Sequence, residues 1–166
     1  LGKLGYTVMI SNFSEYYRMV DYFSTFTNQH IGVAMGVNNL LDVFDEEYYK
    51  NLPGGILEAF GKFFKKDMRV YLYPYKDMKT GELLTSENLK VHDNLKELYK
   101  YFKLNKRIVD IENFNPKFLE IYSREILKKI VTQELGWEEE LPIGVSEMIK
   151  DRQMFGYKEL TFDGLN

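Results

Sequence analysis

Hydrophobic residues in the first two thirds of the chain alternate between short continuous runs and runs at helical spacing. Two continuous runs cover residues 6–10 and 31–37, and each predicts a buried strand. Residues 67–75, which are largely apolar and end at Pro74, predict a third strand. The run at 31–37 lacks polar alternation, so we expect a central strand that is covered on both faces. Apolar residues at helical spacing predict helices after Ser14, which can cap the first of them, over residues 38–51, and from Pro53 onward.

Strands that alternate with helices in this order predict right-handed crossovers and a parallel sheet. The fold class that we expect is α/β, with a Rossmann-like three-layer sheet of at least three strands and helices on both faces. Residues 1–112 would form this core, and "KRIVDIENF" is expected to hold a further short strand. Residues 113–166 would be a helical C-terminal extension with a tail, opened by Asn115-Pro116, within a single domain.

Polar residues follow each of the three predicted strands. In open parallel sheets, ligands bind outside the carboxyl ends of the strands, so we expect these residues to converge on one edge. Hydroxyl, amide and ammonium groups beside helix N-termini suit a phosphate or a sugar. The alternative is that they only cap helices and turn the chain. The candidate binding residues are Ser11, Asn12, Gly36, Asn38, Asn39, Tyr75 and Lys76.

Other motifs do not indicate catalysis or metal binding. "PGG" at residues 53–55 matches neither the phosphate loop nor the dinucleotide-binding glycine pattern, and is read as a bend between two helices. The acidic group of Asp42, Asp45, Glu46 and Glu47 lacks the spacing of a calcium-binding EF-hand loop, so a solvated helix face is the better interpretation. No catalytic residue, metal ligand set or cofactor can be assigned from the sequence.

Composition excludes some partners. The net charge is −3, and no broad basic face is indicated, which argues against nucleic-acid binding. No apolar run approaches the ~18 residues of a membrane span, so we expect no membrane partner. The chain has no cysteine, which fits a reducing cytoplasm. Aromatic residues make up 16% of the chain and are read as a core built from large rings.

Several stretches together resemble a known family: "SNFSEYYRMVDYF", "IGVAMGVNNLLDVFDEEYY", "GGILEAFGKFF", "YLYPYKD", "FNPKFLEIYSREIL" and "MIKDRQMFGY". The whole chain is similar to the C-terminal portion of a conserved, poorly characterised bacterial protein family that is familiar from cyanobacteria. Some members are described as nicotinate-mononucleotide adenylyltransferases. That activity uses an H-x-G-H pair and an I-S-x-T-type phosphate motif, and neither occurs here, so no catalytic residue is carried over.

Three functional hypotheses follow. The first is a Rossmann-like lobe that binds a nucleotide or a small phosphorylated metabolite at the strand ends. The second is a non-catalytic interaction or scaffold domain that packs on a partner subunit, on a second copy, or on an N-terminal part of its own chain. The start at Leu1, within what reads as the end of a helix, suggests such an N-terminal part. The third is a lobe that completes a nucleotidyltransferase whose catalytic motifs lie elsewhere.

Overall fold

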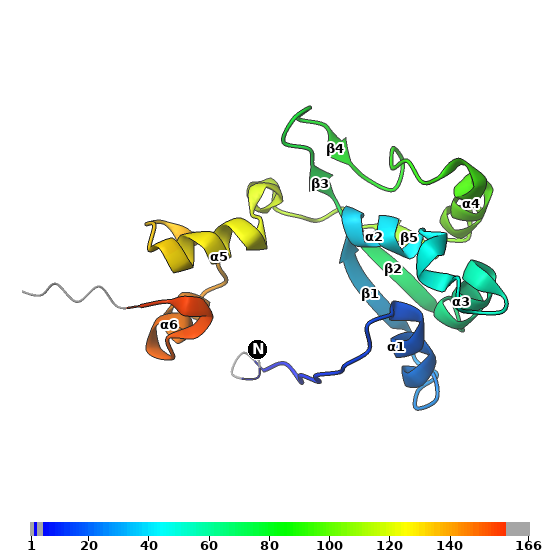
Figure 1. Cartoon of the computed structure of the whole chain (residues 1–166), viewed down its shortest axis with the longest axis horizontal. Helices are drawn as coiled ribbons and strands as arrows, with labels where there is room; N and C mark the ends of the chain where they lie inside the picture. Colours follow the sequence, from blue (N-terminus) through cyan, green and yellow to red (C-terminus); the bar gives the residue numbers. More distant parts are fainter. Residues whose placement is uncertain (1, 3–4, 159–166) are drawn as a thin grey trace, which may run out of the picture. The chain divides into compact units, whose positions relative to one another are not determined.

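The computed structural model describes residue 2 and residues 5–158 and divides into two compact units. Unit 1 is Leu1–Glu112 and unit 2 is Asn113–Asn166. Unit 1 contains every strand of the described residues, and unit 2 contains only helices there (Figure 1). The protein is therefore a mixed α/β chain, and each unit is described by itself.

Unit 1 contains four α-helices, five strands and two 3-10 helices in the part that the structure describes. In chain order they are α1 (Tyr16–Phe23), β1 (Ile31–Gly36), α2 (Val37–Val43), the 3-10 helix η2 (Glu46–Tyr49), α3 (Gly55–Phe63), β2 (Met68–Tyr73), β3 (Tyr75–Lys76), β4 (Leu83–Leu84), the 3-10 helix η3 (Asp93–Leu95), α4 (Lys96–Leu104) and β5 (Ile108–Asp110).

The main sheet has three parallel strands in the order β1-β2-β5. The register pairs Ile31 with Met68 and Gly36 with Tyr73, and β5 pairs with residues 70–72 of β2. The parallel sheet that the sequence predicts is thus confirmed. However, β2 is the central strand and β1 lies at an edge, so the prediction that residues 31–37 form a central strand is wrong.

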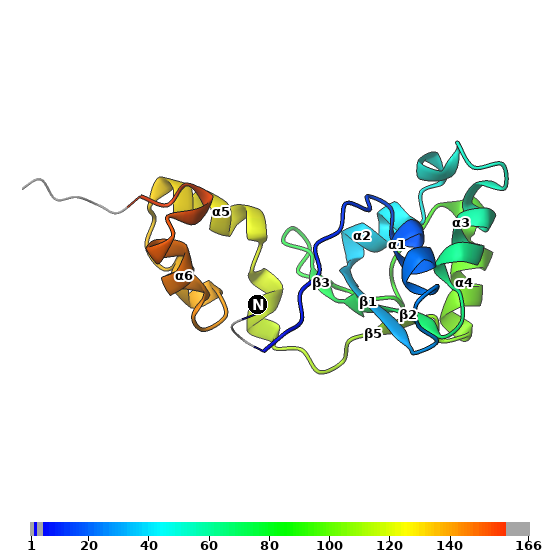
Figure 2. The same cartoon turned by 90° about the horizontal axis from the view of Figure 1, so that it is seen from below.

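Strand order explains why the helices gather on one face. Each strand adds to the same side of the one before it, and right-handed crossovers then place every connecting helix on the same face. Figure 2 shows α1 to α4 on one side of the sheet. The side chains that point towards these helices are buried, namely Val33, Met35, Met68, Val70, Leu72 and Ile108.

The opposite face of the sheet is not covered by any described element of unit 1. Gly32, Ala34 and Gly36 are exposed there, and Tyr71 and Tyr73 are half-buried. The predicted covering of residues 31–37 on both faces is therefore wrong within this unit. What unit 1 shows is a sheet with one layer of helices.

Aromatic rings form the centre of the core on the helix face. Phe60 of α3 is 3% exposed, and its ring centroid lies 5.0–6.1 Å from those of Phe44, Tyr49, Phe64 and Phe102. These pairs adopt the edge-to-face arrangement that aromatic quadrupoles favour. The aromatic core that the composition predicts is the main packing feature of unit 1.

The predicted N-terminal strand is absent. Residues 6–10 are exposed and belong to no strand or helix, and Figure 1 shows this segment leading away from the sheet. The Ser14 hydroxyl donates to Oε2 of Glu15 at 2.7 Å, and no side chain caps the first turn of α1. The predictions of a strand at 6–10 and of a Ser14 cap are both wrong.

Two predicted helices are shorter than their hydrophobic patterns suggest. The helix expected over residues 38–51 ends at Val43 and resumes as η2, where the Asp45 carboxylate accepts from the Glu47 amide at 3.0 Å. The next helix does not begin at Pro53 but at Gly55, whose φ of +54° belongs to the left-handed region that glycine tolerates. The predicted bend at residues 53–55 is confirmed.

The regular elements of unit 2 in its described residues are all helices, joined by turns and irregular segments. Its elements are the 3-10 helix η4 (Pro116–Glu120), α5 (Ser123–Thr132), the 3-10 helix η5 (Trp137–Glu140), α6 (Val145–Asp151) and the 3-10 helix η6 (Met154–Gly156). The Asn115 side chain accepts from the Lys117 amide at 3.0 Å, as predicted for a cap before proline. The core of unit 2 is small: Ile126, Ile130, Trp137 and Ile149. The tail beyond residue 158 lies outside the described residues.

Candidate functional site

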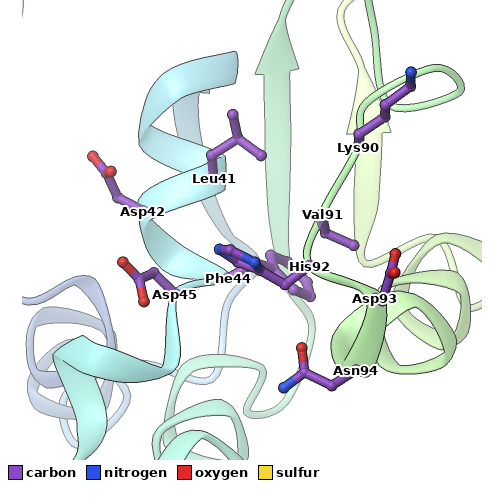
Figure 3. Close-up of a pocket in the computed structure, with 9 residues that line it drawn as sticks. All are labelled: Leu41, Asp42, Phe44, Asp45, Lys90, Val91, His92, Asp93 and Asn94. Atoms are coloured by element: carbon purple, nitrogen blue, oxygen red, sulfur yellow. The ribbon is translucent and has the colours of Figure 1, made fainter.

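A groove of about 790 Å³ lies between α2 and the segment that leads into α4. We call it the α2–α4 groove. Figure 3 shows α2 with its C-terminal end on one side, and the segment from Lys90 to Asn94 on the other. Its lining residues are Leu41, Asp42, Phe44, Asp45, Lys90, Val91, His92, Asp93 and Asn94.

Buried apolar side chains support the groove. Phe44 is 1% exposed, and its ring packs edge to face against Phe60 and Tyr99 at centroid distances of 5.0 and 5.1 Å. Val91 is also buried. Both residues belong to the hydrophobic core of unit 1, so the floor of the groove is part of that core.

The rim of the groove is polar and predominantly acidic. Asp42 and Asp45 come from α2 and the turn after it, and Asp93 comes from the start of η3. Lys90 and His92 are the basic residues, and in Figure 3 the Lys90 ammonium points away from the carboxylates. The Asn94 amide donates to Glu46 and so ties the two sides of the groove together.

One groove carboxylate is held in its charged form by a neighbour. The Lys96 ammonium lies 2.7 Å from Oδ1 of Asp93, and this contact lowers the pKa of the Asp93 carboxyl below its ordinary value. One carboxylate oxygen of Asp45 accepts a hydrogen bond from the Glu47 amide. Among the described residues, no three His, Asp or Glu side chains converge closely enough to hold a metal ion. The negative charge is therefore spread along the rim.

The predicted site at the strand ends is only partly assembled. Gly36 ends β1 and precedes α2, and Asn38 and Asn39 are exposed in the first turn of that helix. Asn39 is partly engaged, because its amide donates to the Tyr16 hydroxyl at 3.1 Å. Gly36 pairs with Tyr73 at the carboxyl ends of β1 and β2, so the hairpin that starts at Tyr75 begins close to Gly36.

The remaining candidates have different surroundings. Tyr75 and Lys76 form β3, which pairs antiparallel with β4, so the long polar stretch after β2 is a hairpin followed by a loop. Ser11 and Asn12 lie in the exposed segment before α1 and follow no strand. The expectation that three strand ends converge therefore fails for the first of them. Whether the others bind a ligand stays a prediction.

A polar cluster at the end of β5 was not predicted from the sequence. Asp110 accepts from the Ser86 amide at 2.8 Å and from the Ser86 hydroxyl at 2.7 Å. The Tyr99 hydroxyl donates to the Ser86 carbonyl at 2.8 Å, and burial, with a smaller contribution from Asp110, raises the pKa of Tyr99. The hydroxyl therefore stays protonated as a donor. This cluster fastens the loop after β4 to the sheet.

Comparisons of the chain with protein-family models, with curated proteins and with solved structures found no match. The resemblance to the bacterial family stays a prediction. Within the described residues, no helix has both the length and the apolar character that crossing a membrane requires.

Proposed function

We propose that unit 1 is a ligand-binding α/β lobe and that its ligand is a small organic cation held in the α2–α4 groove. The observation that supports this proposal is the shape and chemistry of the groove: a cavity of about 790 Å³ with a buried apolar floor and an acidic rim. Concave sites with an apolar floor and a few polar groups are the common form of small-molecule sites.

The charge of the rim decides the class of ligand. Asp42, Asp45 and Asp93 line the groove together with Lys90. The Lys96 ammonium balances Asp93, and the other two aspartates still outnumber the lysine. An anionic phosphate would be repelled from this groove. Because the carboxylates do not converge on a point, an extended cation such as a polyamine suits them better than a metal ion. The phosphorylated ligand predicted for the strand ends would need the separate site at Gly36, Asn38 and Lys76.

A thermal-shift screen tests the proposal. Polyamines and amino sugars at 100 times their dissociation constant should stabilise the protein by about 2.7 kcal/mol, which is roughly several degrees for a domain of this size. Asp45→Asn and Asp93→Asn should each weaken binding, because each removes a rim charge with little change in shape. Glu97→Gln is the matched control, since Glu97 is exposed on α4 and does not line the groove.

Two results would contradict the cation proposal. One is a stabilising response to nucleotides or inorganic phosphate but not to amines, which would favour the strand-end site instead. The other is amine binding that Asp45→Asn, Asp93→Asn and Glu97→Gln weaken equally, because a non-specific charge effect does not depend on the groove.

An interaction role is a second candidate, and a different observation favours it. Large apolar side chains are exposed along the N-terminal segment, α1 and the turn after it: Tyr6, Val8, Met9, Ile10, Phe13, Tyr22 and Phe26. The Tyr22 ring contacts both Phe13 and Phe26, at centroid distances of 5.4 and 5.0 Å, so these three rings form one aromatic surface. Clustered exposed apolar residues are typical of interaction sites.

This aromatic surface can be tested directly. Phe26→Ser should change the free energy of unfolding by less than about 0.5 kcal/mol, because the ring is 73% exposed. It should nevertheless reduce binding of an apolar fluorescent dye by the folded protein. A large loss of stability would show that Phe26 serves the fold rather than an interaction.

Under this second role, a partner would also cover the open face of the sheet and supply the third layer of the Rossmann-like arrangement. A cytoplasmic location stays a prediction for either role.

A further inference from the structure

The N-terminal segment, residues 6–10, has the character of a strand but pairs with nothing described in the structure. Its sequence "YTVMI" is β-branched and apolar. Ile10 is 94% exposed, and Tyr6, Val8 and Met9 are each at least half exposed. A segment of this composition gains free energy when its side chains and its backbone are covered together.

The outer edge of β1 is an unprotected site for strand addition. Natural edge strands are usually short, charged, bulged or interrupted by proline, which prevents pairing with other chains. β1 has six residues, "IGVAMG", with no charge and no proline. By contrast, the other edge strand, β5, has three residues and carries Asp110, with Lys106 and Arg107 directly before it. The two edges therefore differ in their capacity to accept a strand.

The position of α1 shows where a strand that precedes it belongs. Tyr16, at the start of α1, contacts Asn39 near the carboxyl end of β1. At the other end, the Lys66 ammonium, which precedes β2, binds the carbonyls of Ser24 and Thr27 at 2.6 and 3.0 Å. α1 thus runs antiparallel to the strands on the helix face. In a right-handed crossover, the strand before such a helix lies beside β1, on the side away from β2.

We propose that residues 6–10 of one copy add as a parallel strand to the outer edge of β1 in a second copy, and that two copies exchange these segments reciprocally. This proposal rests on the interaction role proposed above. It identifies the partner as a second copy of the chain and the binding mode as strand addition. The second copy is the occupant because the segment leads away from its own β1 in the structure (Figure 1). Reciprocal exchange covers both open edges in a closed, two-fold dimer.

Side-chain alternation fixes the register of the added strand. If Tyr6, Val8 and Ile10 face the helices, they lie level with Ile31, Val33 and Met35, of which the last two are buried on that face. Met9 then lies beside Ala34 on the open face. The opposite register would turn three apolar side chains to the open face and leave only Thr7 and Met9 inside.

Cross-linking between two different copies tests the exchange, and the absence of native cysteine makes it specific. A tagged Met9→Cys copy is mixed with an untagged Ala34→Cys copy and treated with a short bis-maleimide. We expect a linked heterodimer. The matched control replaces Ala34→Cys with Val109→Cys, which lies on β5 at the other edge and should give no link.

A second pair of variants tests whether the segment acts as a strand. Val8→Asp places a charge among the buried residues of the helix face and should abolish the dimer in light scattering. Thr7→Asp, one residue earlier, faces the open side and should retain it. Because residues 6–10 are exposed in the single copy, both variants should fold normally.

Each other outcome overturns the exchange in a distinguishable way. A link formed only within a doubly substituted Met9→Cys, Ala34→Cys monomer would show that the segment docks on its own chain. A dimer that gives no link would leave the interaction role standing but refute this mode. A chain that remains monomeric at high concentration and gives no link would refute self-association altogether.

Discussion

Phe60→Ala should destabilise unit 1 by about 3–5 kcal/mol, the usual cost of removing a fully buried ring. Phe60 is 3% exposed and contacts four other aromatic rings, so its removal leaves a cavity that rigid rings cannot refill. The loss is a large part of the 5–15 kcal/mol that is typical of a whole domain. Urea unfolding followed by aromatic circular dichroism measures it.

Leu57→Ala is the matched control for this substitution. Leu57 lies on the same helix but is 67% exposed, and its truncation should cost less than about 0.5 kcal/mol. Equal losses for the two variants would contradict the assigned core. Phe60 also packs against Phe44, which forms the floor of the groove. Phe60→Ala should therefore lower the affinity of the groove for its ligand as well.

The order of elements was predictable because it depends on local pattern. The apolar run at residues 31–37 and the largely apolar stretch at 67–75 predicted β1 and β2, and the intervening helical spacing implied a parallel crossover. Asn115 before Pro116 was recognisable as a cap for the same reason: donor and acceptor lie two residues apart.

The position of each strand in the sheet was not predictable from pattern alone. The run at 31–37 has no polar alternation, which suggested a strand covered on both faces. In the structure, the exposed face of β1 carries only Gly32, Ala34 and Gly36. One of them has a packing reason: a Cβ on Gly32 would lie 2.9 Å from the Tyr71 ring, which packs over it. Small, non-polar residues on an exposed face therefore produced the same sequence pattern as a strand that is buried on both faces.

The candidate groove was hidden because its two sides are far apart in sequence. In the sequence, Asp42 and Asp45 belong to an acidic group whose spacing favours a solvated helix face. Their significance depends on Asp93, about 50 residues later, which only the packing of α2 beside the start of α4 brings close. The spacing of residues in the sequence does not indicate such a contact, because the chain has 25 Asp and Glu residues and nothing in their order shows which of them meet.

Asp110→Ala should cost about 1–3 kcal/mol, because it leaves the buried Ser86 with an unpaired amide and an unpaired hydroxyl. Ser86 is 3% exposed, and Asp110 accepts both of its hydrogen bonds. Asp110→Asn should lose less, since its amide oxygen still accepts one of the two bonds. Urea unfolding gives the total, and hydrogen exchange at the Ser86 amide reports the local opening.

Glu112→Ala separates this effect from a general loss of charge. Glu112 follows β5 and is exposed, so its removal should leave both measurements nearly unchanged. Faster exchange at Ser86 in Asp110→Ala alone would show that the cluster fastens the loop after β4. Because that loop leads into Lys90 and Val91, its release should also loosen one wall of the groove. Amine binding should therefore weaken in Asp110→Ala but not in Glu112→Ala, and unchanged binding in both would show that the groove does not depend on this loop.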